Sequence, residues 1–177
     1  YPAIGANEIS VAEYVIGAIC VLMRRNAYNA NADVIAGQWP RNALIGREIA
    51  GKHLGLIGYG ANARETAKRA LAMGLHVSAC DPNVLPEDSV WLQPTGQVEP
   101  QPLDAIIAQS DILSIHAPLT PQTRNLIDAT AIAHMKKGAM LINAARGGIV
   151  DEEALVAALK AGKLGGVLGK LAAIGGD

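Results

Sequence analysis

The chain has 177 residues and a formal net charge of −1; half of its residues are apolar and 18% are charged. Such a composition is typical of one globular domain and excludes a disordered tail or linker. The near-zero charge argues against nucleic acid as the main partner, because phosphate binding normally shows as a basic excess.

The chain is predicted to begin with a buried helix. Ser10 and Glu13 have the spacing of a capping box, and Ile9 and Tyr14 have the spacing of a hydrophobic staple, so the helix should begin after Ser10. Apolar residues on nearly all sides of this helix indicate burial against another domain or subunit. They are Val11, Val15, Ala18 and Leu22 on one face and Ile16, Ile19 and Met23 on another.

Residues 24–50 are polar around Trp39-Pro40 and predict an arm, so residues 1–50 are expected to form a helix-and-arm unit. The longest apolar run, residues 14–23, is shorter than the roughly 20 residues that a membrane span needs. Cys20 and Cys80 show no CxxC pattern, which favours a reducing, cytoplasmic setting.

Residues 51–164 alternate short apolar runs with helical patterns. The predicted strands are Leu54–Gly58, His76–Cys80, Ile112–His116 and Ala139–Asn143. The predicted helices are one with a small-residue stripe (Ala63, Ala67, Ala70, Leu71 and Gly74), one from Asp128 to Gly138, and one from Asp151 to about Gly162. This alternation implies right-handed crossovers and a parallel sheet, so a Rossmann-type, doubly wound α/β domain is expected over 51–177. A proline-rich connection with a short edge strand near Val98 and a further strand at Val167 complete the prediction.

The segment GYGANA, between the first strand and a helix, is the strongest local signal. Gly58 permits a tight turn, Gly60 lets the backbone approach a pyrophosphate, and Ala63 allows close helix–strand packing. The amides of Ala61 and Asn62 open the helix and would face the phosphates. An ordinary glycine-rich turn has the same pattern, but the strand, the helix and an acid at the right distance agree here.

Asp81 is that acid, at the end of the second predicted strand and 21 residues after Gly60. A carboxylate there accepts hydrogen bonds from the adenosine ribose and repels the 2′-phosphate of NADP. Pro82 and Asn83 follow, so no adjacent Arg is offered to that phosphate, and NAD is preferred. The alternative is that Asp81-Pro82 only begins a turn.

Two further strand ends carry candidate ligand-binding residues. His116 and Pro118 follow the third strand, where open α/β sheets bind ligands, although a His satisfied by the backbone fits equally well. Thr120-Pro121 has the pattern of an N-cap and a first helical residue. Arg146 stands among small residues and could grip a carboxylate in bidentate fashion; the alternative is a solvated surface charge. No Cys/His cluster suggests a metal.

These segments in series resemble the NAD-binding domain of the D-isomer-specific 2-hydroxyacid dehydrogenases, which include D-lactate, glycerate, phosphoglycerate and formate dehydrogenases. The similarity runs from about Gly5 to Leu164, through SVAEYVIG, GREIAGKHLGLIGYGANARETAKRALAMGLHVSACDP, SDILSIHAPLTPQTRNLI and MKKGAMLINAARGGIVDEEALVAALKAGKL. It implies an oxidoreductase that transfers a hydride between NAD(H) and a 2-hydroxy or 2-keto acid.

The resemblance also implies roles for particular residues. Arg146 would grip the substrate carboxylate and carbonyl. The cofactor contacts would be Gly58, Tyr59, Gly60, Ala61, Asn62, Asp81, His116, Pro118, Thr123, Ala144 and Ala145. The family forms homodimers, and the helix after Ser10 and the arm around Trp39 match the segments of that contact.

Two positions depart from the family pattern. Lys170 falls where an Asp contacting the nicotinamide amide is expected, and Gly175 falls about where a Glu tuning the catalytic His is expected. The catalytic His motif and most of the substrate domain would lie outside residues 1–177. We therefore expect the isolated chain to bind NAD(H) weakly and to turn over little. The alternative is a catalytically silent module that senses NAD or assembles with partners; another Rossmann enzyme, such as a methyltransferase, would leave the Arg146 loop without a purpose.

Overall fold

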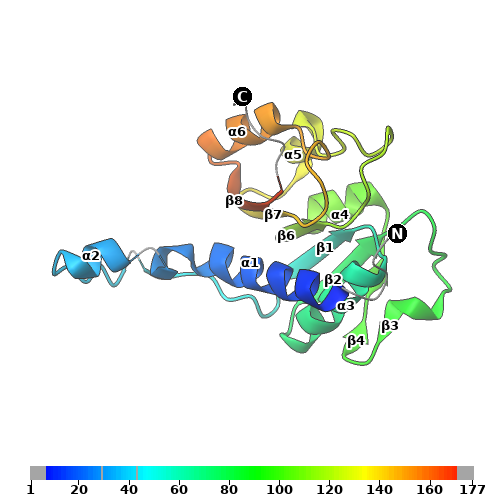
Figure 1. Cartoon of the computed structure of the whole chain (residues 1–177), viewed down its shortest axis with the longest axis horizontal. Coiled ribbons are helices and arrows are strands. Elements are labelled where there is room, and N and C mark those ends of the chain that lie inside the picture. Colours follow the sequence, from blue (N-terminus) through cyan, green and yellow to red (C-terminus); the bar gives the residue numbers. More distant parts are fainter. Residues whose placement is uncertain (1–6, 29, 43, 171–177) are drawn as a thin grey trace.

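The computed structural model describes residues 7–28, 30–42 and 44–170. A parallel sheet of six strands lies at its centre, in the order β5-β2-β1-β6-β7-β8 (Figure 1). The strands are β1 (His53–Ile57), β2 (His76–Cys80), β5 (Glu99–Pro100), β6 (Ile112–Ile115), β7 (Ala139–Asn143) and β8 (Leu164–Gly169). The chain builds outward from β1 on one side and from β6 on the other, which confirms the predicted doubly wound α/β fold.

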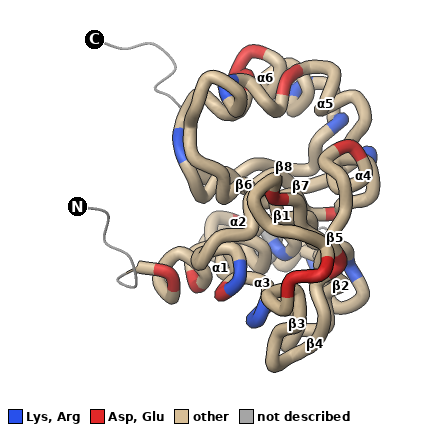
Figure 2. The backbone as a smooth tube through the Cα atoms, turned by 90° about the vertical axis from the view of Figure 1, so that its right-hand side faces the viewer, with Lys and Arg blue, Asp and Glu red and all other residues tan. Residues whose placement is uncertain are grey.

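Helices cover both faces of this sheet (Figure 1). One face carries α1 (Glu8–Tyr28) and α3 (Ala61–Ala72), and the other carries α4 (Leu103–Gln109), α5 (Ala129–His134) and α6 (Glu152–Lys160). Strands β6 and β7 are buried along their whole length, as expected for a parallel sheet covered on both sides. Figure 2 shows both signs of charge along α3 and α6.

Three smaller elements lie outside the main layers. They are α2 (Asn31–Ile35), the 3₁₀ turn η1 (Ser89–Trp91) and a hairpin of β3 (Leu92–Gln93) and β4 (Gly96–Gln97). Figure 1 shows α2 beyond the far end of α1, away from the sheet. No described helix is both long and apolar enough to cross a bilayer.

The contact between α1 and α3 depends on the predicted small-residue stripe. Ala63, Ala67 and Ala70 of α3 are fully buried and belong to the same core cluster as Val15 and Ile19 of α1. Small side chains let the two helices approach closely. The outer face of α3 carries the expected ion pair between Glu65 and Arg69.

The start of α1 differs from the prediction. The amide of Val11 donates to the carbonyl of Asn7 at 2.9 Å, so the helix begins before Ser10, which cannot cap it. Ile9 and Tyr14 are both exposed and form no buried staple. One face of α1 is buried against α3 and the sheet, whereas Ile9, Tyr14 and Val21 lie on exposed surface.

Several other predicted boundaries also shift. Asp128 and Asp151 cap α5 and α6 as expected, but α5 ends at His134, because Met135 is extended. Thr120-Pro121 begins a run of turns rather than a helix. Strand β8 begins three residues before the predicted start at Val167.

Candidate cofactor and substrate site

The predicted site residues gather where the strands end, at the carboxyl edge of the sheet. Neighbouring strands β1 and β6 lie where the strand order changes direction. Open α/β sheets bind ligands in the crevice outside such a point, because the following loops diverge there.

Gly58 and Gly60 make the loop between β1 and α3. Gly58 has φ +86°, and a Cβ at this position would lie 3.0 Å from the amide nitrogen of Ala117. Gly60 precedes α3 with φ −75°, and a Cβ there would meet no atom within 4 Å. Gly58 therefore serves the turn, whereas Gly60 keeps open the space in front of the helix.

Tyr59 points away from that space. Its ring is buried and stacks on Trp91 with centroids 4.5 Å apart, and burial raises the pKa of its hydroxyl. The hydroxyl donates to the carbonyl of Val90 at 3.2 Å and accepts from Gln93 at 3.0 Å. The expected cofactor contact therefore cannot come from the Tyr59 side chain, which belongs to the core.

Asp81 ties the end of β2 to the glycine loop. Its Oδ2 accepts from the backbone amide of Tyr59 at 2.8 Å, and its Oδ1 accepts from the amide of Asn83 at 2.9 Å. The second bond makes Asp81 the first residue of a turn as well, so the two alternatives for this residue are compatible. Asp81 also lines a hollow of about 270 Å³ with Cys80, whose pKa burial raises to about 11, and Trp91.

A larger cleft, of about 500 Å³, lies beside the glycine loop. It brings together residues from the start of α3 and from the loops after β6 and β7. Its lining contains six of the predicted site residues, Asn62, His116, Pro118, Ala144, Ala145 and Arg146. Thr123 is not in this lining; its hydroxyl donates to the carbonyl of Pro118 at 2.6 Å and so supports the wall from behind.

His116 is held as a neutral ring at this cleft. Its Nε2 lies 3.0 Å from the Oγ of buried Ser114, and its Nδ1 is buried without a hydrogen-bond partner in the described part of the chain. Burial lowers the pKa of His116 to about 4, so the ring is uncharged near pH 7.

Arg146 is exposed, and one of its guanidinium nitrogens donates to the carbonyl of Ala145 at 2.9 Å. Beneath it lies Asn143, which sequence reasoning did not single out. Asn143 donates to the carbonyls of Arg146 and Lys170, at 2.8 Å each, and accepts from the amide of Ala145 at 3.1 Å. An amide residue at the end of an otherwise apolar strand was the available signal.

Comparison with known proteins identifies the fold and its cofactor. Residues 17–169 match the family described as D-isomer specific 2-hydroxyacid dehydrogenase, NAD binding domain. The chain belongs to this family. The NAD-binding domain is 48% identical over 167 residues to (S)-sulfolactate dehydrogenase of Chromohalobacter salexigens, covering 94% of this chain and 53% of that protein.

Other relatives of this NAD-binding domain carry related names. Hydroxypyruvate reductase of Thermotoga maritima is 42% identical over 160 residues, covering 90% of this chain and 50% of that protein. The NAD-dependent formate dehydrogenase of Staphylococcus aureus, solved in complex with NAD, superposes with a TM-score of 0.83 at 31% identity, covering 94% of this chain and 49% of that one. The chain thus spans about half the length of the curated relatives it matches.

The residues of this NAD-binding domain fit the cofactor. Open space at Gly60 leaves room for a pyrophosphate in front of α3, whose first amides belong to Ala61 and Asn62. The Nδ1 of His116, which has no hydrogen-bond partner among the described residues, adds an unsatisfied polar atom beside the same cleft. Lys170 is exposed at the end of β8, where the family pattern has Asp; Gly175 lies outside the described residues. Among the described residues, no group of three or more His, Cys, Asp or Glu could hold a metal ion.

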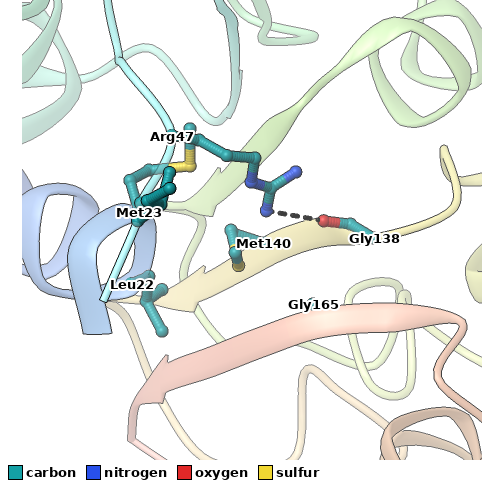
Figure 3. A pocket seen from close by; sticks show the side chains of 8 residues that line it. Leu22, Met23, Arg47, Gly138, Met140 and Gly165 are labelled. Atoms are coloured by element: carbon teal, nitrogen blue, oxygen red, sulfur yellow. Dashed lines mark hydrogen bonds between the residues drawn. The ribbon is translucent and has the colours of Figure 1, made fainter. Parts of the chain in front are cut away.

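A third pocket of the NAD-binding domain, of about 230 Å³, lies at the opposite edge of the sheet, where β7 and β8 begin (Figure 3). Arg47 reaches across it and donates to the carbonyl of Gly138 at 3.1 Å. Leu22 and Met23 of α1 and Met140 of β7 complete its apolar walls. The contact fastens the segment that returns from the arm to the sheet.

Proposed function

We propose that the protein is an oxidoreductase that transfers a hydride between NAD(H) and a 2-hydroxy or 2-keto acid, and that this chain is its coenzyme-binding part. One observation carries the proposal: a single cleft joins the start of α3, the neutral His116 and the cationic Arg146. The names of the relatives, a sulfolactate dehydrogenase and a hydroxypyruvate reductase among them, support a small hydroxy acid as substrate.

Each residue has a physical task in this proposal. The amides of Ala61 and Asn62 bind the pyrophosphate, because the amino end of a helix favours an anion. Asp81 accepts from the adenosine ribose with the Oδ2 lone pair that the Tyr59 amide leaves free, because its Oδ1 already accepts two bonds from Asn83. Bound NADH supplies the hydride, and Arg146 holds the substrate carboxylate through paired N–H donors.

Reduction of a 2-keto acid also needs a proton donor, and the described lining of the cleft does not supply one. His116 and Arg146 are the two titratable groups among the described residues of the cleft. His116 is already neutral, and an Arg does not release its proton near pH 7. The described lining therefore binds and orients the reactants. A second candidate, an NAD-binding module without turnover, is favoured by Lys170, which stands where the family pattern has Asp.

Two further features belong to the proposal. The helix and arm of residues 1–50 form the contact of a homodimer, because exposed apolar side chains gather there. Two unpaired thiols, Cys20 and Cys80, fit a reducing cytoplasmic compartment.

The test combines NADH binding with reduction of a panel of 2-keto acids. NADH should bind the parent protein, meaning the protein without substitutions, as measured by the fluorescence of NADH. Arg146→Gln should retain NADH binding but lose affinity for oxamate, a 2-keto acid analogue, and with it any reduction. The control is Arg124→Gln, at a nearby exposed arginine outside the cleft lining, which should change neither NADH binding nor oxamate binding. A folded protein that binds no NADH contradicts the proposal; NADH binding without reduction or oxamate binding selects the module.

A further inference from the structure

Asn143 uses both side-chain donors and its side-chain oxygen in bonds to the loop that carries Arg146 and to the end of β8. It is only 1% exposed, and it is the one side-chain amide that is buried in the described part of the chain. Its two Nδ2 hydrogens go to the carbonyls of Arg146 and Lys170, and its Oδ1 accepts from the amide of Ala145. Each of these partners is a backbone atom, so the bonds fix the course of the chain rather than one rotamer.

The bonds to Ala145 and Arg146 close the loop upon the side chain of Asn143. An Oδ1 that accepts from the amide two residues ahead makes an Asx-turn, which sets the direction in which the chain leaves β7. The bond to the Arg146 carbonyl then holds the residue that bears the guanidinium. The guanidinium in turn donates to the Ala145 carbonyl. Both the backbone and the side chain of Arg146 are therefore hydrogen-bonded within the same short loop.

The backbone at the end of β8 also lies in close contact with Asn143. A Cβ at Gly169 would lie 2.3 Å from the Asn143 carbonyl oxygen, and this carbonyl accepts from the amide of Lys170 at 2.9 Å. The backbone of Asn143 thus pairs β7 with β8, whereas its side chain adds the bonds to the Arg146 loop. A residue that only ended the strand would not need those additional bonds.

We propose that Asn143 is a positioning residue that holds Arg146 in the orientation needed to bind the carboxylate of a 2-keto acid, an inference that rests on the proposed function. Asn is required because the site needs two donors and one acceptor on a single planar group. An aspartate has the same shape, but it would replace the Nδ2 donor by an acceptor oxygen that faces the two carbonyl oxygens. Small misplacements of a binding group cost much of its effect, so loosening this loop should weaken carboxylate binding.

The experiment is a double-mutant cycle of Asn143→Asp and Arg146→Lys in the parent protein, read as oxamate affinity in the presence of NADH. Each single variant should weaken oxamate by about tenfold, and the double variant should be little worse than either one, because Asn143 acts through Arg146. NADH affinity should change far less, whereas the unfolding midpoint of Asn143→Asp should fall, because the variant buries a carboxylate against two carbonyl oxygens. Asn143→Ser, which keeps an acceptor for Ala145 but only one donor, should fall between the parent and Asn143→Asp and serves if the latter does not fold.

The matched control is Ser110→Ala, which removes a buried side-chain bond to the backbone of Ile106, at the opposite edge of the sheet. It should lower stability without altering oxamate affinity. Unchanged oxamate binding in the Asn143 variants, or strictly additive losses with Arg146→Lys, overturns the positioning role alone. A parent protein that binds NADH but no oxamate overturns the substrate proposal and this role together.

Discussion

Gly58 and Gly60 stand in one loop but answer to different constraints. The backbone at Gly58 occupies a conformation that residues with a Cβ rarely adopt, and the space beside it is filled by the chain after β6. The backbone at Gly60 suits any residue, and its surroundings are open. The fold therefore needs the first glycine, whereas only a ligand would need the second.

This difference predicts opposite phenotypes for Gly58→Ala and Gly60→Ala. Gly58→Ala should lower the free energy of unfolding by at least about 1 kcal/mol, because of its positive φ and its contact with Ala117. Gly60→Ala should leave that free energy nearly unchanged but weaken NADH binding, because the methyl group enters the pyrophosphate space. Denaturant unfolding and NADH titration of both variants measure the two effects. Gly17→Ala, whose new Cβ also meets no atom within 4 Å, is the control and should bind NADH as tightly as the parent. NADH binding by Gly60→Ala as tight as by the parent would contradict the assignment of Gly60 to the pyrophosphate space.

His116 predicts an acid-sensitive fold. Burial lowers its pKa from 6.5 to about 4, so between these values the unfolded chain binds a proton that the folded chain does not. Stability should therefore fall as the pH falls through this window, by about 2 kcal/mol between pH 7 and pH 5. Denaturant unfolding at both pH values measures the loss. His116→Gln should remove that part of the pH dependence, whereas His134→Gln, at an exposed histidine, should leave it in place; an equal slope in parent and His116→Gln would refute the argument.

At the scale of elements, the strands were predictable and some helix starts were not. A parallel strand buried on both faces is a short apolar run that stops abruptly, and β2 and β7 have the predicted bounds. The caps at Asp128 and Asp151 are equally local and are confirmed. The spacing of Ser10 and Glu13 is also that of a cap, but its use depends on where the helix begins, and Asn7 already accepts its first bond.

Contacts between residues far apart in the chain explain why the orientation of Tyr59 and the bonds of Asn143 could not be predicted from the sequence. Tyr59 lies inside the cofactor motif, yet its ring turns inward because Trp91, far along the chain, provides a stacking partner. Asn143 bonds to Lys170 after a whole helix and strand have intervened. The residues that meet at the cleft were predictable from strand ends, whereas the bonds that orient them depend on tertiary packing that no local pattern contains.

The packing of α3 against α1 gives a prediction at this scale. Ala67 is fully buried at the contact, whereas Ala72 of the same helix is exposed. Ala67→Leu should overpack the contact and lower the free energy of unfolding by about 1–3 kcal/mol. Ala72→Leu inserts the same side chain into solvent and should stay within about 0.5 kcal/mol of the parent. Equal unfolding free energies for the two variants, measured by denaturant titration, would show that this contact has room to spare.

For the whole molecule, the apolar surface is distributed unevenly. Ile9, Tyr14 and Val21 lie exposed on α1, and Ile35 and Trp39, on and beside α2, are 87% and 70% exposed. Figure 1 shows α2 beyond the far end of α1, away from the sheet, so the core of this chain cannot cover Ile35 and Trp39. Exposed apolar patches of this kind mark interaction sites, and the proposed homodimer gives them a partner.

Charge placed on this surface should therefore separate the subunits without unfolding them. Ile35→Asp and Trp39→Asp should each convert a species of twice the chain mass to the single-chain mass in sedimentation velocity, because an interface cannot bury an unpaired carboxylate. Leu92→Asp, on exposed β3 away from α1 and α2, replaces an equally exposed apolar side chain and should leave the mass doubled. A parent protein that sediments as a single chain at micromolar concentration would refute the dimer. A doubled mass in both arm variants would instead move the contact off the arm, leaving the exposed face of α1 as the surface to test next.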